Sequence, residues 1–194
     1  PSVLIPRPET EELVLWIIDE QDGLPDGIID LGTGSGCIAI ALAKEFPNSR
    51  VYGVDVEVKA LNLAQENAKS HGVDIDFFLF DILKEESLGF QQYEIMVSNP
   101  PYVTEEDGRY MQKNVLENEP HKALFAPGVD PFIFYRRIVD LADGHLRAGG
   151  RLYFEINERF GAEIRSLLLD RGYRNVVLRK DLNGKDRMIK ARKE

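Results

Sequence analysis

The chain has 194 residues, enough for one domain with a sizeable core, and its composition, 43% hydrophobic and 29% charged, is that of an ordinary globular protein. Its formal net charge of −9 argues against a protein that mainly grips phosphate backbones, because such proteins are usually basic. No apolar run approaches the roughly 20 residues that span a bilayer, and the single cysteine, Cys37, excludes an intrachain disulfide. We therefore expect a cytoplasmic protein with neither a membrane nor a stable nucleic-acid partner.

The N-terminal segment, residues 1–24, is predicted to be a linker and a helix that lead into the main domain. Thr10 is placed to cap this helix, with Glu11 and Glu12 in its first turn, where the helix dipole favours negative charge. The remaining residues, 25–194, are predicted to form a single domain.

Strand-like and helix-like segments alternate along that domain. The pattern predicts strands at 27–31, 50–56, 75–81, 93–98 and 150–156, and helices at 37–46, 57–72, 131–146 and 159–172. Two further strands, 173–180 and 186–193, flank an Asn-Gly turn and read as an antiparallel hairpin. The alternation predicts an α/β fold with a doubly wound, mostly parallel sheet of seven strands that ends in this hairpin.

A glycine-rich loop, with the sequence DLGTGSG, joins the first predicted strand to a helix. Gly32, Gly34 and Gly36 allow a sharp turn and let a ligand approach the unpaired N–H groups of the helix start. The spacing G-x-G-x-G differs from the dinucleotide fingerprint G-x-G-x-x-G, and no Walker lysine follows Gly36. Asp30 adds negative charge where a pyrophosphate would sit. The loop indicates a ligand with a cationic centre and no phosphate, such as S-adenosylmethionine, although a plain tight turn would also use these glycines.

Acidic residues follow the next two predicted strands. Asp55 ends the second strand, 23 residues after Gly32, where a carboxylate can accept hydrogen bonds from both hydroxyls of a ribose. Asp81 ends the third predicted strand and Ile82 follows it, where the amino group and ring face of an adenine would lie. The alternative for Asp55 is an exposed carboxylate at a strand end with no ligand.

A second loop, NPPY at residues 99–102, follows the fourth predicted strand. A planar amide or aromatic amine is a poor nucleophile, because its nitrogen lone pair is delocalised. Asn99 offers a side-chain carbonyl and Pro100 a backbone carbonyl, which together can hold the two N–H bonds of such a group. Pro100 and Pro101 restrict the backbone, so the acceptors are fixed in advance, and Tyr102 can lay its ring on a planar substrate. The alternative is a simple turn, which Asn-Pro commonly starts.

Both loops and both acids follow parallel strands, and ligands of open parallel sheets bind outside the carboxyl ends of the strands. We therefore expect the glycine loop, Asp55, Asp81 and Asn99 to face one crevice. No metal is expected, because the histidines have no ligand spacing: they are His71, His121 and His145.

The NPPY loop and the upstream DLGTGSG resemble those of class I methyltransferases that modify planar nitrogens. Three longer segments, PSVLIPRPETEELV, NEPHKALFAPGVDPFIFYRRI and DLNGKDRMIKARK, are similar to the protein-(glutamine-N5) methyltransferases of peptide-chain release factors. The resemblance covers essentially the whole chain. It implies a Rossmann-like methyltransferase fold, S-adenosylmethionine as the methyl donor, and the glutamine of a release factor's Gly-Gly-Gln motif as the acceptor.

The same resemblance implies which residues form the site. Asp55 would hold the ribose and Ile82 would flank the adenine, where family members often have an aromatic residue. The cofactor loop would consist of Gly32, Thr33, Gly34, Ser35 and Gly36, and the substrate glutamine would be clasped by Asn99, Pro100, Pro101 and Tyr102. Five further residues match a family segment near the active site without an assigned role, namely Arg7, Pro8, Glu9, Thr10 and Glu11; His121 also has none. Family members carry a helical N-terminal domain that helps to bind the release factor, and we expect that these residues lack it.

Three other functions remain open at this point. The same loop would serve methylation of a glutamine in a ribosomal protein. N6-adenine methylation of DNA or RNA is less favoured by the acidic balance and by the absence of a separate recognition segment. A non-catalytic module that keeps the cofactor fold is disfavoured, because it would need neither Asp55 nor the Asn99–Tyr102 loop.

Overall fold

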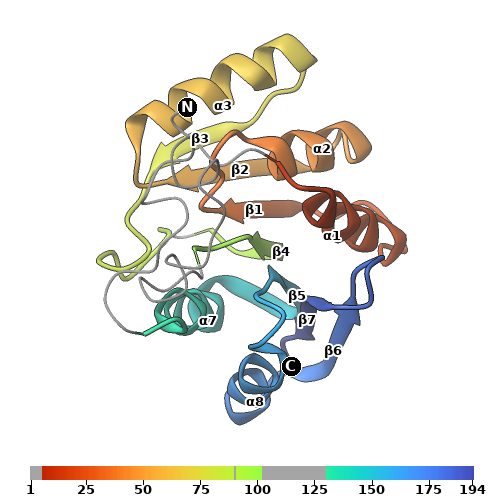
Figure 1. The fold of residues 1–194 in the computed structure, drawn as a ribbon. Coiled ribbons are helices and arrows are strands. Elements are labelled where there is room, and N and C mark those ends of the chain that lie inside the picture. The colour runs from red at the N-terminus through yellow and green to blue at the C-terminus, as the bar shows by residue number, and fades with distance from the viewer. Residues whose placement is uncertain (1–5, 90, 102–129) are drawn as a thin grey trace, which may run out of the picture.

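The computed structural model describes residues 6–89, 91–101 and 130–194. These residues form a seven-stranded sheet with helices on both faces (Figure 1), as the sequence predicts. Its strands are β1 (Gly27–Leu31), β2 (Arg50–Asp55), β3 (Asp76–Leu79), β4 (Tyr93–Ser98), β5 (Leu146–Glu155), β6 (Arg174–Lys180) and β7 (Asp186–Arg192). The helices are α1 (Pro8–Asp19), α2 (Cys37–Glu45), α3 (Val58–His71), α7 (Ile133–His145) and α8 (Gly161–Asp170).

The strand order is β3-β2-β1-β4-β5-β7-β6. The first five strands in this order are parallel, and β7 pairs antiparallel with both β5 and β6. The chain runs outward from β1 to β3 and then returns to β4 on the other side of β1. The direction of winding therefore reverses between β1 and β4, where Leu31 is paired with Ser98. In open α/β sheets such a reversal marks the place where ligands bind.

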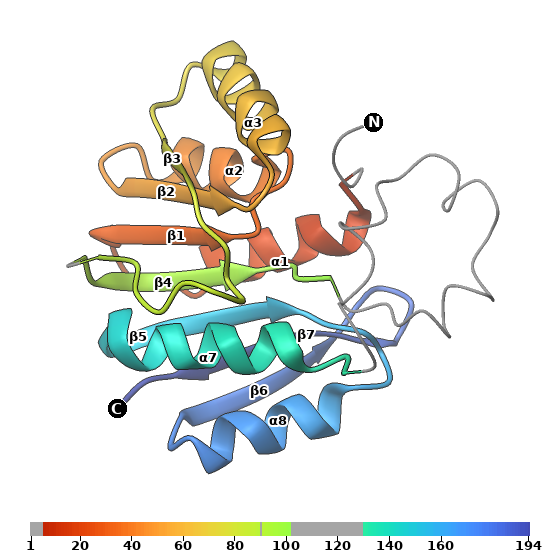
Figure 2. The same cartoon turned by 90° about the vertical axis from the view of Figure 1, so that its left-hand side faces the viewer.

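Alternating side chains of the parallel strands feed two hydrophobic cores. Ile28 packs with α1 and α2 on one face, whereas the next residue, Ile29, packs with α7 and α8 on the other. The two views show α1, α2 and α3 on one side of the sheet and α7 and α8 on the opposite side (Figures 1 and 2). A sheet that is covered on both faces needs strands that are apolar throughout, and β1 is buried along its whole length.

The start of α1 differs from the prediction. The helix begins at Pro8, with Arg7 at the N-cap position, and no side chain caps it within the described part of the chain. Proline suits the first helical position because its φ angle is already helical and it has no N–H to satisfy. The interpretation of Thr10 as the cap is therefore wrong, and its buried hydroxyl is used elsewhere.

Two strand boundaries also differ from the prediction by more than one residue. The third strand ends at Leu79, so Asp81 lies two residues beyond its end. The Asp81 carboxylate accepts a hydrogen bond from the Leu83 N–H at 3.0 Å, and such local bonding turns the backbone away from a strand. The fifth strand begins at Leu146, directly after α7, rather than at residue 150. No helix among the described residues is long and apolar enough to cross a membrane.

Candidate active site

The glycine loop between β1 and α2 is held by backbone hydrogen bonds. The N–H groups of Gly32 and Thr33 both donate to the carbonyl of Val54 on β2, at 2.9 and 2.8 Å. Gly32, Gly34 and Gly36 have φ angles of 76°, 56° and 81°. For residues with a Cβ, this left-handed region costs about 1–2 kcal/mol in conformational free energy, which explains why the loop uses glycine at these positions.

The three glycines differ in what surrounds them. A Cβ added to Gly32 or Gly34 would meet no heavy atom of the described residues within 4 Å, so these residues leave this side of the loop open. A Cβ at Gly36 would lie 3.1 Å from the Cβ of Ala64 on α3 and 3.3 Å from Ile40. Gly32 and Gly34 therefore leave room for a ligand, whereas Gly36 lets α2 and α3 pack closely.

Asp30 lies beneath this loop at the end of β1 and is fully buried. Its Oδ2 accepts a hydrogen bond from the Thr33 hydroxyl at 2.7 Å, while its Oδ1 has no partner among the described residues. Burial raises the pKa of Asp30 to about 7, against the lowering effect of the Thr33 hydrogen bond. An acid with an unused buried oxygen suits a nearby hydrogen-bond donor or positive charge.

Asp55, at the end of β2, contacts the glycine loop directly, as the sequence predicts for residues of one site. Its Oδ2 accepts from the Gly34 N–H and its Oδ1 from the Glu57 N–H, both at 2.9 Å. Burial raises its pKa, opposed by these two hydrogen bonds. A carboxylate has about four lone-pair positions, so both oxygens can still accept one more donor.

Asn67 on α3 is a residue that the sequence pattern did not single out. Its Nδ2 donates to the backbone carbonyl of Ser35 at 2.9 Å and so fixes the far side of the glycine loop. The two residues are 32 positions apart, and Asn67 sits in a helix with an ordinary amphipathic pattern. Only the packing of α3 beside the loop gives this asparagine its role.

Asp81 and Ile82 follow β3 at the same edge of the sheet. The Asp81 carboxylate forms a salt bridge with Lys84 at 2.9 Å in addition to its bond with Leu83 N–H. Slight burial acts to raise its pKa, but these contacts outweigh burial and lower the pKa. Ile82 is buried and belongs to the core on the α7 side. In this structure, therefore, Asp81 is engaged locally and Ile82 packs inward.

Asn99 is the first residue after β4 and meets two segments from distant parts of the sequence. Its Nδ2 donates to the Thr10 hydroxyl oxygen of α1 at 3.3 Å. The Thr10 hydroxyl in turn donates to Oε2 of Glu155, the last residue of β5, at 2.6 Å. Burial raises the pKa of Glu155, while the Thr10 hydrogen bond lowers it. Neither Thr10 nor Glu155 was predicted to act together with Asn99.

The rest of the NPPY loop is described only in part. Pro100 is buried and Pro101 half-buried, while Tyr102 and His121 lie outside the described residues. The Ser98 hydroxyl donates to the Leu31 carbonyl at 2.6 Å, so the ends of β1 and β4 are tied together. The NPPY corner thus begins beside the glycine loop.

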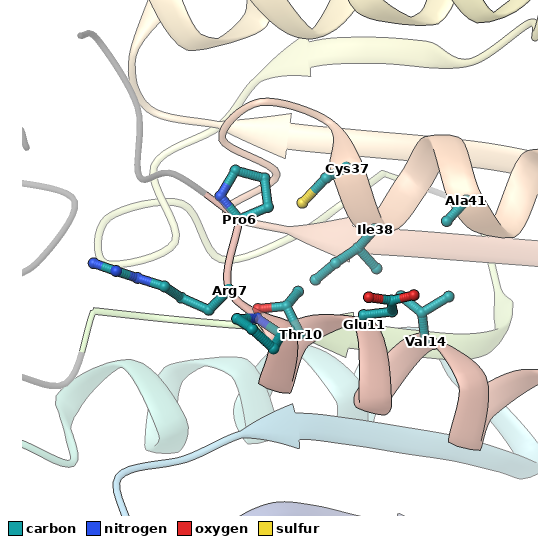
Figure 3. Close-up of a pocket in the computed structure, with 9 residues that line it drawn as sticks. Pro6, Arg7, Thr10, Glu11, Val14, Cys37, Ile38 and Ala41 are labelled. Carbon is teal, nitrogen blue, oxygen red and sulfur yellow. The ribbon is translucent and has the colours of Figure 1, made fainter. Parts of the chain in front are cut away.

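A pocket of about 400 Å³ lies between α1 and α2 at this edge of the sheet (Figure 3). Thr10 and Glu11 line it from α1, and Cys37, the first residue of α2, lines it from the other side. The volume is in the range of small-molecule sites. The pocket therefore lies between the Thr10 contact and the start of the helix that follows the glycine loop.

Within the described residues, no group of three or more His, Cys, Asp or Glu side chains is placed to hold a metal ion. His145 has a structural role: it bonds the Leu88 N–H at 3.1 Å and the Gln91 carbonyl at 3.1 Å. The features that fit a ligand are organic ones, namely the open face over Gly32 and Gly34, the unused oxygen of Asp30 and the spare acceptor positions of Asp55. They suit a molecule with hydroxyl donors and a cationic centre.

Comparison with known proteins identifies the class of this chain. Residues 10–129 match the family model of the Methyltransferase small domain. A 16S rRNA methyltransferase of T. thermophilus, solved with AdoMet and guanosine, has a similar fold, with a TM-score of 0.67 and 18% identity over 98% of this chain and 44% of that one. The chain is a methyltransferase with this fold.

Curated relatives show which kind of methyltransferase this chain resembles. The chain is 51% identical to the release factor glutamine methyltransferase of Flavobacterium psychrophilum and 45% identical to that of Bacteroides thetaiotaomicron. Each match covers 98% of this chain and 68% of the relative. The chain belongs to the family of release factor glutamine methyltransferases, as its sequence motifs indicated.

Proposed function

We propose that this chain transfers a methyl group from S-adenosylmethionine to the side-chain amide nitrogen of the glutamine in the Gly-Gly-Gln motif of peptide-chain release factors. The names of the relatives at 51% and 45% identity support this substrate. The observation that carries the chemistry is the orientation of Asn99. Its NH₂ group is turned toward Thr10, so its carbonyl Oδ1 is the end left to accept a hydrogen bond from a substrate.

The nitrogen of a carboxamide, which would accept the methyl group, is a poor nucleophile, because its lone pair is delocalised into the carbonyl. Asn99 Oδ1 and the backbone carbonyl of Pro100 would accept its two N–H bonds, hold the nitrogen in place and favour a pyramidal geometry. Pro100 and Pro101 fix this corner before the substrate arrives. Tyr102 would cover the flat face of the glutamine side chain.

The cofactor would lie across the glycine loop. Gly32, Thr33, Gly34, Ser35 and Gly36 would line it, with Asp30 supplying negative charge beneath. Asp55 would accept the ribose hydroxyls with its remaining lone pairs, and Asp81 and Ile82 would meet the adenine. When bound, S-adenosylmethionine supplies an electrophilic methyl group on a sulfonium. The AdoMet in the T. thermophilus enzyme of the same fold supports this choice.

Two other acceptors would use the same corner. A glutamine of a ribosomal protein presents the same carboxamide. An adenine amino group in DNA or RNA is a planar nitrogen too, but the net charge of −9 disfavours a polyanionic partner. A release factor acts at the ribosome, so we place the reaction in the cytoplasm. We retain residues 25–194 as the methyltransferase domain and 1–24 as the segment that leads into it.

A transfer assay separates these substrates. Tritiated S-adenosylmethionine is incubated with the chain and, in parallel, with a purified release factor, its Gly-Gly-Ala variant, ribosomal proteins and DNA. We expect label on the release factor only, and none on the Gly-Gly-Ala variant. Label on DNA or on a ribosomal protein alone would replace the proposed substrate, and label that persists on the Gly-Gly-Ala variant would place the modification at another residue.

A further inference from the structure

A buried chain of hydrogen bonds runs from Glu155 through Thr10 to Asn99. It joins the end of β5, the first turn of α1 and the corner after β4. The Thr10 hydroxyl donates to Glu155 Oε2 at 2.6 Å, and Asn99 Nδ2 donates to the Thr10 oxygen at 3.3 Å. Glu155 is 2% exposed and Thr10 5% exposed, so water does not compete at either residue.

The direction of this chain follows from the number of donors. A hydroxyl has one proton to donate, and an ionised carboxylate can only accept. With Glu155 ionised, the Thr10 proton must point to Glu155, so the Thr10 oxygen can only accept from its other neighbour. The Asn99 amide must then present its NH₂ to Thr10. Its carbonyl oxygen is thereby turned away from Thr10, toward the position that we propose for the substrate amide.

We propose that Glu155 and Thr10 are positioning residues that set the orientation of the Asn99 amide, and through it make this corner an acceptor of the substrate N–H rather than a donor. The proposal rests on the methyl transfer proposed above. Its consequence is that the ionised form of Glu155 is the productive one, although Glu155 touches neither substrate nor cofactor.

Protonation of Glu155 would reverse the direction of these hydrogen bonds. A protonated carboxyl can donate to the Thr10 oxygen, which releases the Thr10 proton to point toward Asn99. The Asn99 amide would then turn to accept it with Oδ1 and present NH₂ to the substrate. Two N–H groups facing each other cannot bond, so the substrate amide would lose its side-chain acceptor.

Several charges surround Glu155 and adjust this protonation. Its pKa is raised by burial and by the negative charge of Glu9 on α1. It is lowered by side-chain hydrogen bonds from Thr10 and Asn99 and by the positive charge of Arg187 on β7. Glu155 in turn helps to raise the pKa of the Cys37 thiol on α2. Asp30, the other buried acid of this edge, has its own raised pKa, so a pH effect must be assigned by substitution.

The sign of the pH effect separates positioning from stability. A buried acid with a raised pKa binds a proton more tightly in the folded state than in the unfolded state, so at this group the fold gains stability as pH falls. The turnover number should fall over the same range, because the Asn99 carbonyl is lost. Activity and stability therefore change in opposite directions as Glu155 is protonated.

Kinetic variants test the role of the chain of hydrogen bonds. Thr10→Val keeps the shape but removes the hydroxyl, and we expect kcat to fall about tenfold or more while the Kd of S-adenosylmethionine stays within about twofold. Thr10→Ser restores the hydroxyl and should restore most of kcat. Tyr173→Phe is the matched control, because it removes a hydroxyl that donates to Asp143 at 3.0 Å on an element remote from the site and should leave kcat unchanged.

A spectroscopic measurement tests the same hydrogen bonds without turnover. In protein labelled with ¹⁵N-asparagine, the side-chain amide signal of Asn99 should shift with pH in the native chain and stop shifting in Glu155→Gln. The acid limb of the kcat profile should disappear in the same variant. If Thr10→Val does not fold, Thr10→Ser and Glu155→Gln still decide the matter through these two profiles.

The outcomes are distinct. A native protein that is inactive, but whose Asn99 amide signal follows the protonation of Glu155, would count against the proposed substrate. It would leave the proposed hydrogen bonds from Glu155 through Thr10 to Asn99 intact. An active native chain in which Thr10→Val keeps its kcat, or in which Glu155→Gln keeps the acid limb, would overturn the positioning role. A Thr10→Val variant that changes only the Kd of S-adenosylmethionine would overturn it as well.

Discussion

Two buried acids at the same edge of the sheet each receive a threonine hydroxyl. Thr33 donates to Asp30 at 2.7 Å, and Thr10 donates to Glu155 at 2.6 Å. The first pair is three residues apart in the sequence, whereas the second is 145 residues apart. Both acids have raised pKa values caused first by burial. The chemistry of the two pairs is the same, but the way in which the chain assembles them is not.

This contrast extends to the loops that the two pairs support. The glycine loop is held mainly by its own backbone and by the end of the neighbouring strand β2. The corner at Asn99 is held by side chains from α1 and β5, whose residues Thr10 and Glu155 are 145 positions apart in the sequence. The part of the site that we assign to the cofactor is thus built locally, and the part that we assign to the substrate is built by the tertiary fold.

The largest effect should come from the corner at Asn99. We expect Asn99→Ala to lower kcat by roughly a hundredfold or more, as for the removal of one preorganised polar group from a reacting centre. The affinity for S-adenosylmethionine, measured by calorimetry, should remain close to that of the native chain. A variant that loses cofactor affinity and keeps kcat would show that the two halves of the site are not separate in function.

The next effect concerns the packing of the glycine loop. Gly36→Ala introduces a Cβ 3.1 Å from Ala64 at a φ angle of 81°, and we expect a loss of about 2–4 kcal/mol in the free energy of unfolding. Gly32→Ala is the matched control, because its Cβ would meet no atom of the described residues within 4 Å, so only the backbone cost of about 1–2 kcal/mol is expected. Chemical denaturation measures both, and equal losses would contradict the different roles of the two glycines.

Asp55→Ala should weaken the binding of S-adenosylmethionine by roughly ten- to a hundredfold, because a charged acceptor contributes about 1.5–3 kcal/mol. The same change also frees the N–H groups of Gly34 and Glu57, so Asp55→Asn, which keeps two polar atoms in place, is the useful comparison. Calorimetry on both variants is the measurement. Unchanged affinity in Asp55→Ala would remove this residue from the cofactor site.

The smallest effect should come from Asn67. Asn67→Ala removes one hydrogen bond to the Ser35 carbonyl, worth about 0.5–1.5 kcal/mol, and should weaken cofactor binding a few-fold with no change in kcat at saturation. Ser70→Ala is a suitable control on the same helix, since its hydroxyl bonds only the Asn67 carbonyl among the contacts described for it. A larger effect of Ser70→Ala on cofactor affinity would argue against the proposed support of the loop.

Much of the fold could be predicted from local sequence. Strands such as 27–31 and 93–98 are short apolar runs that end at polar or glycine-rich loops, and both bounds are confirmed. The start of α1 was predicted wrongly because Thr10 has the chemistry of a cap, whereas its tertiary partner Glu155 takes the hydroxyl. A prediction from local sequence cannot include a hydrogen-bond acceptor that lies 145 residues away.

The site divides in the same way. The contact between Asp55 and the glycine loop follows from the carboxyl ends of adjacent parallel strands, which the predicted topology already implies. Asn67 and Glu155 belong to no motif, and Thr10 lies in a family segment that assigns it no role. Their contacts appear only when α3, α1 and β5 are placed around the loops. The predicted ligand roles of the site residues, those of Asp81, Ile82 and Tyr102 included, stay predictions.

The pairing of Leu31 with Ser98 fixes a length that neither loop can alter. Neighbouring strands lie about 4.8 Å apart, so the two loops leave the sheet at a separation set by the backbone lattice. Sequence changes within either loop can alter affinity and selectivity. The distance between the part that we assign to the cofactor and the part that we assign to the substrate is set by the sheet. Insertions in the loops should therefore be tolerated far better than a bulge in β1 or β4.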